Sequence, residues 1–144
     1  MRRKEKEMTD PAKIDAVIKQ SRVCRLAMSD DDHPYVVPLC FGYADNALYF
    51  HSAEAGRKIE ILKKNNRVCF EFDIDPMLVK KGRDGCDWGM TFQSVIGFGR
   101  AHFVEDEAAK RRALDIIMRQ YDDGTFQYAD AKLKRTAVIK VDIE

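Results

Sequence analysis

The stretch of sequence that decides the fold runs Leu48-Tyr49-Phe50-His51-Ser52-Ala53-Glu54-Ala55-Gly56-Arg57-Lys58 and continues as Ile59-Glu60-Ile61-Leu62-Lys63-Lys64-Asn65. An apolar strand ends in small polar residues, passes a glycine and opens a helix whose first residues are basic. Backbone N–H groups at a helix start attract anions, through unpaired donors and the positive end of the helix dipole. Two cations placed there favour a phosphate over a carboxylate. The stretch predicts a cradle for a phosphorylated ligand; the alternative is a surface turn followed by a solvated basic helix face.

Length and composition describe one globular domain. The chain has 144 residues, of which 45% are hydrophobic and 34% charged, so it can bury a core and is too apolar for disorder. Its net charge of +1 gives no reason to expect a nucleic-acid partner. No apolar run approaches the roughly 20 residues that span a bilayer, so no membrane partner is expected. The basic start, Met1 to Glu7, lacks a following apolar segment, and we therefore expect a cytoplasmic protein whose single domain spans residues 1–144.

The cysteines and histidines are not spaced as metal ligands. Cys24, Cys40 and Cys69 fall within expected strands, where free cysteine behaves as a small buried hydrophobe. Cys86 lies in a loop and is the only cysteine expected to meet solvent. Because no CxxC pair is present, neither a disulfide nor a metal site is predicted.

Hydrophobic patterns predict six strands and three helices. The strands are expected at residues 23–29, 35–43, 47–52, 67–75, 90–105 and 136–143, and the helices at 9–20, 57–65 and 106–121. Short hairpin connections favour an antiparallel sheet over alternating βαβ units. Closure of that sheet would remove its exposed edges. The expected fold is therefore mainly β, a six-stranded antiparallel barrel with peripheral helices.

Three segments carry a resemblance to a known family. They are Val36 to Tyr43, Tyr49 to Lys58 and Ser94 to Ala101, and the strand Cys24-Arg25-Leu26-Ala27-Met28 adds to them. In this order they resemble the pyridoxamine 5′-phosphate oxidase-like FMN-binding split barrels, and within them the 5-nitroimidazole reductase group most of all. The likeness extends from Met1 to about Tyr121.

The resemblance implies a cofactor, an assembly and a set of contacts. It implies FMN bound at the interface of a homodimer, which gives two sites. Gly56-Arg57-Lys58 would hold the phosphate, and His51-Ser52-Ala53 would line the phosphate and the ring. The backbone of Val37-Pro38-Leu39-Cys40 would run along the isoalloxazine edge. Ser94 would be a polar flavin contact, supplied in many relatives by the other subunit; relatives often have a glutamine there, which reaches further.

Each of these residues also has a structural alternative. Arg57 and Lys58 could be solvated cations, and only one of the adjacent pair need face the ligand. Ser52 could merely cap the following turn. His51 could be a strand-end histidine, or a catalytic group beside the flavin that positions substrate or supplies a proton. Trp88 and Phe92 are core or dimer-interface residues, or an aromatic wall over a flat substrate.

The expected function is that of an FMN-binding oxidoreductase that reduces nitroaromatic or related small acceptors. A small aromatic substrate would stack on the flavin beside His51, and the cofactor would carry the hydride chemistry. One alternative is a non-catalytic FMN- or haem-binding protein, with His51 or His102 as a haem ligand. Another is a pyridoxamine-phosphate oxidase-type enzyme, disfavoured because no second basic cluster offers a pocket for a substrate phosphate.

Overall fold

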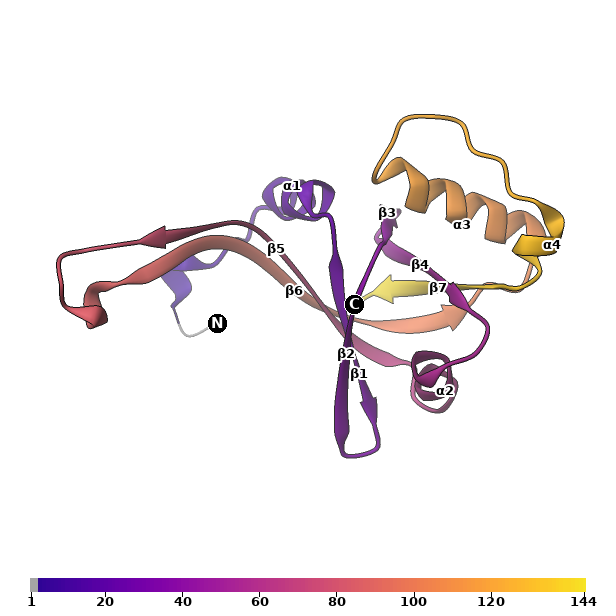
Figure 1. Cartoon of the computed structure of the whole chain (residues 1–144), viewed down its shortest axis with the longest axis horizontal. Coiled ribbons are helices and arrows are strands. Elements are labelled where there is room, and N and C mark those ends of the chain that lie inside the picture. The colour runs from indigo at the N-terminus through magenta and orange to yellow at the C-terminus, as the bar shows by residue number, and fades with distance from the viewer. Residues whose placement is uncertain (1–2) are drawn as a thin grey trace. The chain divides into compact units, whose positions relative to one another are not determined.

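The computed structural model describes residues 3–144 (Figure 1), so Met1 and Arg2 of the basic start lie outside the described residues. The helices are η1 (Lys4–Lys6), α1 (Pro11–Gln20), α2 (Arg57–Lys64), η2 (Gly85–Asp87), α3 (Glu107–Arg119) and α4 (Asp130–Leu133). The strands are β1 (Cys24–Asp30), β2 (His33–Leu39), β3 (Gly42–Ala44), β4 (Ala47–Ala53), β5 (Arg67–Val79), β6 (Gly89–Phe103) and β7 (Thr136–Ile143).

The described residues group into two compact units. The barrel unit comprises Arg22–Glu71 and Ile96–Glu144. The ribbon unit comprises the described residues up to Ser21 together with Phe72–Val95. Strands β5 and β6 run from one unit into the other, and each unit is described here by itself.

The sheet of the barrel unit is antiparallel and closes on itself. Its strand order is β2-β1-β5-β6-β7-β4-β3. Strands β2 and β3 therefore stand at opposite ends of the order, although only Cys40 and Phe41 separate them in the chain. Because the three Cα–Cα steps from Leu39 to Gly42 reach no further than about 11 Å, the sheet must curve until its two ends meet. This confirms the expected mainly β, antiparallel barrel.

Alternation of apolar and polar side chains explains why these segments are strands. In β1, Cys24, Leu26 and Met28 are buried, while Arg25 between them is exposed. Such a period of two places every second side chain on the core face. The barrel core is built from Leu26, Phe41, Leu48, Phe50, Phe70, Val138, Ile139 and Val141, all of them at most 2% exposed.

The structure has seven strands where six were expected. The segment at residues 35–43 is broken at Cys40 and Phe41 into β2 and β3. The break occurs because the Phe41 N–H donates to the Tyr121 hydroxyl (2.9 Å) instead of continuing the ladder. Strand β5 also runs past its expected end to Val79: Asp75 adopts a left-handed φ of 53°, and the strand resumes after that kink.

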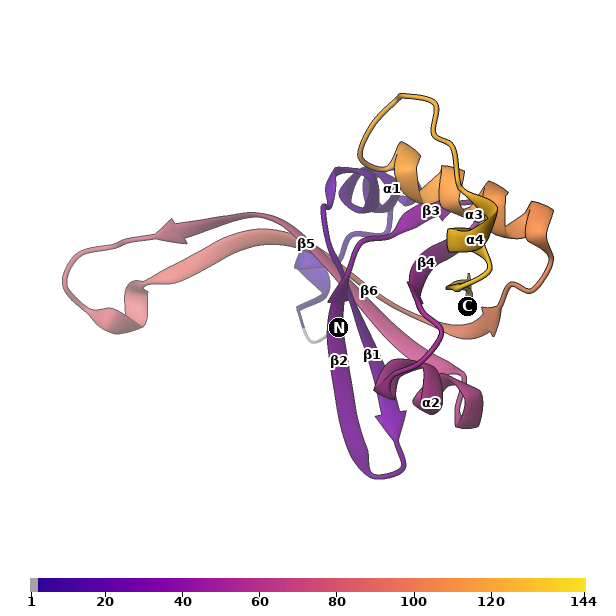
Figure 2. The same cartoon turned by 45° about the vertical axis from the view of Figure 1, so that its right-hand side comes forward.

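The helices begin at the expected side-chain caps. Asp10 accepts a hydrogen bond from the Ala12 N–H (3.0 Å), and Asp106 accepts one from the Ala109 N–H (2.8 Å). Helix α3 packs on β3 and β4 (Figure 2). Its buried face meets α4, a short helix that the sequence did not predict; the cluster comprises Ala113, Leu114, Ile117, Leu133 and Val138.

The ribbon unit combines α1 with the far ends of β5 and β6. Val17 and Ile18 of α1 are buried, but the ends of the two strands carry large apolar side chains that remain 45–65% exposed: Met77, Leu78, Trp88, Met90 and Phe92. Trp88 and Phe92 are therefore not core residues of this chain. No helix among the described residues is both long and apolar enough to cross a membrane.

Candidate functional site

The turn that leads from β4 into α2 has the geometry expected of an anion site. Gly56 is the N-cap of α2 and adopts φ 125°, a conformation that residues with a Cβ rarely take. No side chain caps this helix start, and no heavy atom would lie within 4 Å of a Cβ at Gly56. The first N–H groups of α2 are therefore accessible to an anionic ligand.

The two basic residues that open α2 differ in their surroundings. The Arg57 guanidinium lies 3.4 Å from the Asp30 carboxylate and 4.7 Å from the centroid of the Tyr35 ring. Asp30 ends β1 and Tyr35 lies in β2, so Arg57 is held against the β1–β2 hairpin. Exposed ion pairs of this kind contribute little stability, but they do orient the side chain.

Lys58 is half-buried, and burial lowers the pKa of its ammonium group. No carboxylate of the described residues lies within ion-pair distance of it. A partly buried cation without a counter-ion is unfavourable. An anionic ligand at the start of α2 would supply that counter-ion.

His51 lies in β4 next to Lys58. The residue is exposed, but desolvation by the surrounding protein, and then the positive charge of Lys58, lower the pKa of the imidazole. At neutral pH the ring is therefore uncharged, with one nitrogen as donor and the other as acceptor. The strand also places Ser52, half-buried, opposite Ala137, and Ala53, exposed, opposite Thr136. The structure thus brings His51 and Lys58 close enough for the charge of one to act on the other.

The segment Val37 to Cys40 lies at the end of β2. Val37, Pro38 and Leu39 pair with Leu26, Arg25 and Cys24 of β1. Cys40 lies beyond the last pair and is exposed, so the expectation that it is buried was wrong. The strand that would have buried it ends at Leu39.

Of the other three cysteines, Cys24 and Cys86 lie as expected, whereas Cys69 is less buried than expected. Cys24 is fully buried, and burial raises the pKa of its thiol to about 12. Cys69 is half-buried, and Cys86 in η2 is exposed.

Ser94 belongs to the ribbon unit, whereas the other predicted site residues belong to the barrel unit. It lies in β6 and is half-buried, and the neighbouring Gln93 is exposed. The expected role of Ser94 stays a prediction.

The barrel unit has two hollows that the predicted residues do not line, although the first is lined by Glu54 and Ile59, which directly follow Ala53 and Lys58 in the chain. The first lies between α2, the end of β6 and β7, and its charged lining comprises Glu54, Lys63, Glu105 and Lys110. The second is lined by Leu62, Lys63, Lys64, Asn66, Ala101, His102 and Phe103. Neither is lined by a residue of the predicted site.

Tyr121 is a residue whose part in this region was missed. The sequence places it on the apolar face of α3, and it does pack edge-on against Phe41, with ring centroids 6.5 Å apart. Its hydroxyl also accepts from the Phe41 N–H and donates to the Arg22 carbonyl, both at 2.9 Å. Its partners are 80 and 99 residues away in the chain, so no local signal could have shown them.

Comparison with known proteins identifies relatives over nearly the whole chain. The family model described as pyridoxamine 5′-phosphate oxidase matches residues 10–144. The chain is 38% identical to a candidate 5-nitroimidazole antibiotic resistance protein of Bacteroides thetaiotaomicron VPI-5482, covering 95% of this chain and 81% of that one, with a TM-score of 0.86. It is 27% identical to an FAD-binding protein of Mesorhizobium loti, covering 94% of this chain and 90% of that one, with a TM-score of 0.66.

A shorter match exists to an uncharacterized protein of Rhizobium meliloti (strain 1021). It is 34% identical over 55 residues, which are 38% of this chain and 36% of that relative. The chain thus matches little more than a third of this relative's length. Together the matches confirm the resemblance and the split-barrel fold inferred from the sequence, and the expected flavin cofactor agrees with them.

Proposed function

Because this chain belongs to the pyridoxamine 5′-phosphate oxidase family, whose model matches residues 10–144, we propose that it binds FMN and reduces small nitroaromatic acceptors. The observation that carries the proposal is the half-buried Lys58 ammonium, which has no counter-ion among the described residues and lies at a helix start without a side-chain cap. A phosphate monoester satisfies both features at once.

The residues present fit FMN. Lys58 and the first N–H groups of α2 would hold the phosphate, and Arg57 would add a second, more distant cation. The strand end at His51-Ser52-Ala53 leads directly into this cradle, and the flavin ring would extend from it along the Val37–Cys40 backbone. Bound FMN supplies the hydride and electron transfer.

This chain's own residues would then orient the acceptor beside the flavin. The neutral imidazole of His51 offers one donor and one acceptor for a polar substituent of the substrate, such as a nitro group. A second subunit placed over the site would exclude water from it. The likeness to the Bacteroides protein at 38% identity supports a nitroimidazole as the acceptor.

The test begins with the purified protein. A flavin absorption spectrum supports FMN as the cofactor, whereas a Soret band would identify haem as the ligand instead. The flavin-loaded protein is then photoreduced without oxygen and mixed with a 5-nitroimidazole. Reoxidation of the flavin with loss of nitro absorbance supports the proposed reaction. A reduced flavin that the nitroimidazole does not reoxidise, together with an oxidised flavin that pyridoxamine 5′-phosphate reduces with formation of pyridoxal 5′-phosphate, would contradict it.

Replacement of His51 tests the positioning role. We expect His51→Ala to retain FMN and to slow reoxidation by the nitroimidazole roughly tenfold, since a neutral imidazole orients the substrate. A loss of about 10²–10⁴-fold would indicate proton transfer instead. His102→Ala is the matched control: that exposed histidine lies 3.4 Å from Asp142 and is expected to leave the rate unchanged. An unchanged rate in both variants would indicate that His51 has a structural role only.

The pKa of His51 predicts how stability varies with pH. The folded chain holds this pKa below the ordinary value of 6.5, so the unfolded chain binds the proton more readily. Stability therefore falls as the pH drops below about 6.5, and His51→Gln should reduce that fall.

We further propose that two copies form the working unit. In the barrel unit the large apolar side chains of Val36, Ile96 and Phe98 are 59–64% exposed. Large apolar side chains exposed in this number mark an interaction surface. Ile96 and Phe98 lie two residues apart in β6 and so share a face.

A charge on that face should prevent dimerisation. We expect the double variant Ile96→Lys, Phe98→Lys to sediment as a monomer and to bind FMN weakly, because a permanent interface buries more than ~2,000 Å² and tolerates no unpaired charge. Thr125→Lys, Gln127→Lys, which adds the same charge to exposed residues between α3 and α4, is the control and should leave the dimer intact. A wild-type protein that is monomeric and still binds FMN tightly would contradict the proposed dimer.

A further inference from the structure

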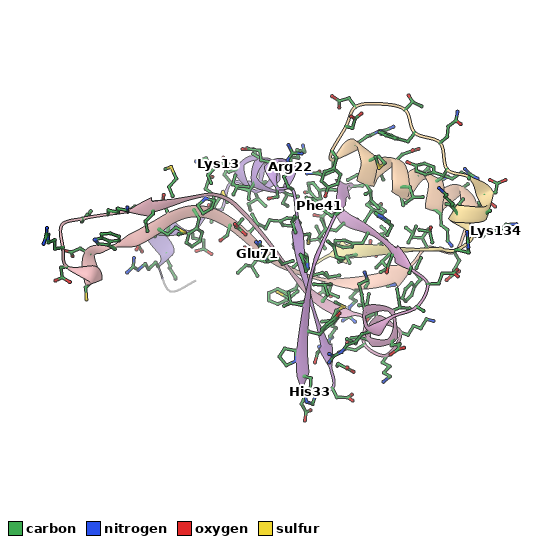
Figure 3. The ribbon with its side chains drawn as sticks, viewed as in Figure 1. Lys13, Arg22, His33, Phe41, Glu71 and Lys134 are labelled. Atoms are coloured by element: carbon green, nitrogen blue, oxygen red, sulfur yellow. The ribbon has the colours of Figure 1, made fainter. Side chains whose placement is uncertain are left out.

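At the seam of the barrel, where β2 passes into β3, the Tyr121 side chain bridges two backbone groups. Continuing the β1–β2 register two residues beyond the pair Cys24↔Leu39 places Arg22 opposite Phe41. A ladder that continued there could join the Phe41 N–H directly to the Arg22 carbonyl. Instead the Tyr121 hydroxyl stands between them, accepting from one and donating to the other. Figure 3 labels Arg22 and Phe41, which lie near each other at this seam.

Two further contacts fix α3 to the same place. The Tyr121 ring packs edge-on against Phe41, which is fully buried. Next along the chain, the backbone of Gly42 lies so close to α3 that a Cβ would come within 2.6 Å of the Ile117 nitrogen. The Cys40–Gly42 crossover is thereby tied to a rigid helix and not only to its neighbours in the sheet.

The hydroxyl can serve as donor and acceptor at once because it stays protonated. Burial raises the pKa of Tyr121 to about 12, against the opposing effect of the Phe41 N–H, and the nearby thiols of Cys40 and Cys24 raise it further. Across the physiological range the phenol is therefore neutral and bridges both backbone groups.

We infer that Tyr121 is a positioning residue of the flavin site: its hydroxyl fixes the Cys40–Phe41 crossover and thereby the Val37–Cys40 backbone along the flavin ring. This inference rests on the proposed function, since it concerns the backbone on which the ring would lie. Because FMN and riboflavin share the same ring, loss of Tyr121 should affect the binding of both flavins. Loss of the phosphate cradle should affect the binding of FMN alone.

Replacing Tyr121 by phenylalanine removes the bridge and keeps the ring packing. We expect Tyr121→Phe to weaken the binding of FMN and of riboflavin equally, by roughly tenfold, because the Phe41 N–H and the Arg22 carbonyl lose their shared partner. The visible absorption bands of the bound flavin should shift, and the Phe41 amide should exchange hydrogen faster.

Tyr128→Phe is the matched control. The Tyr128 hydroxyl donates to Asp115 of α3 at 2.9 Å, so its loss also removes one hydrogen bond from α3, but it does not contact the crossover. It should leave flavin affinity and spectrum unchanged. Equal losses in both variants, or wild-type affinity and spectrum in Tyr121→Phe, would overturn the inference while leaving the proposed function intact. A wild-type protein that binds no flavin would overturn the proposed function and this inference with it.

Discussion

The double replacement Arg57→Ala, Lys58→Ala is expected to weaken FMN binding at least about a hundredfold and to leave riboflavin binding nearly unchanged. Hydrogen bonds to charged groups contribute about 1.5–3 kcal/mol each, and about 1.4 kcal/mol corresponds to a factor of ten in affinity. Riboflavin lacks the phosphate, so it does not use these bonds. The difference between the two flavins separates a phosphate contact from a general loss of structure, which would weaken both.

The single replacements should divide this effect unequally. Arg57 already contacts Asp30 and the Tyr35 ring, so Arg57→Ala should cause only a small part of the loss of FMN affinity. Lys58 has no counter-ion among the described residues, so Lys58→Ala should account for most of the loss. Lys63→Ala, which removes the same charge from the exposed end of α2, is the control and should leave the affinity unchanged.

The pH dependence gives a second measurement of the same contact. Burial lowers the pKa of Lys58 from 10.5, and a bound phosphate would raise it again. FMN affinity is therefore highest below the lowered pKa of Lys58 in the free protein, and it falls as the pH rises through that pKa. The affinity of the Lys58→Ala variant should not show this fall. Isothermal titration of both flavins across the alkaline range measures it. Equal affinities of wild type and double variant at all pH values would leave Arg57 and Lys58 as ordinary surface charges.

Local patterns carried most of the fold. The alternation through Cys24, Leu26 and Met28 marks a strand in any context, and Asp106 before an apolar stripe marks a helix start. Gly56 followed by two cations is likewise a local signal, readable because a helix start attracts anions whatever surrounds it. These features depend on neighbours within four residues, which a sequence displays directly.

The features that were missed depend on contacts between distant segments. The break at Cys40 and Phe41 is caused by Tyr121, and nothing in the apolar run from residue 35 to 43 indicates this break. The different roles of Arg57 and Lys58 follow from Asp30, which is 27 residues away. Trp88 and Phe92 show why the burial of apolar side chains could not be predicted either. The same apolar pattern occurs where the side chains face a core and where they are exposed, as these two are.

Replacing Gly42 by alanine is expected to destabilise the fold by about 3 kcal/mol, at the upper end of the usual cost of overpacking. The added Cβ would lie 2.6 Å from the Ile117 nitrogen, 2.7 Å from the Ile116 carbonyl carbon and 2.8 Å from its oxygen. All three atoms belong to the backbone of α3, so no side-chain rotation can relieve the overlap. The whole helix would have to move away from β3.

The replacement of Gly97 by alanine is a comparison for Gly42→Ala, and the replacement of Gly89 is the control. A Cβ at Gly97 would lie 2.2 Å from the ring of Phe70, a side chain that is buried but can turn, so Gly97→Ala should cost less than Gly42→Ala. A Cβ at Gly89 would meet nothing within 4 Å, and Gly89→Ala should stay within about 0.5 kcal/mol of wild type. Urea unfolding of the three variants gives this order directly.

The same displacement of α3 links stability to the flavin site. Moving the helix away from Gly42 also draws Tyr121 away from Phe41, so Gly42→Ala should weaken FMN and riboflavin alike even under conditions where the variant is fully folded. Lys58→Ala, by contrast, should distinguish the two flavins and leave the urea midpoint unchanged. If Gly42→Ala unfolds at the wild-type urea concentration, α3 does not press on the crossover, and the close contact that fixes the seam of the barrel is absent in solution.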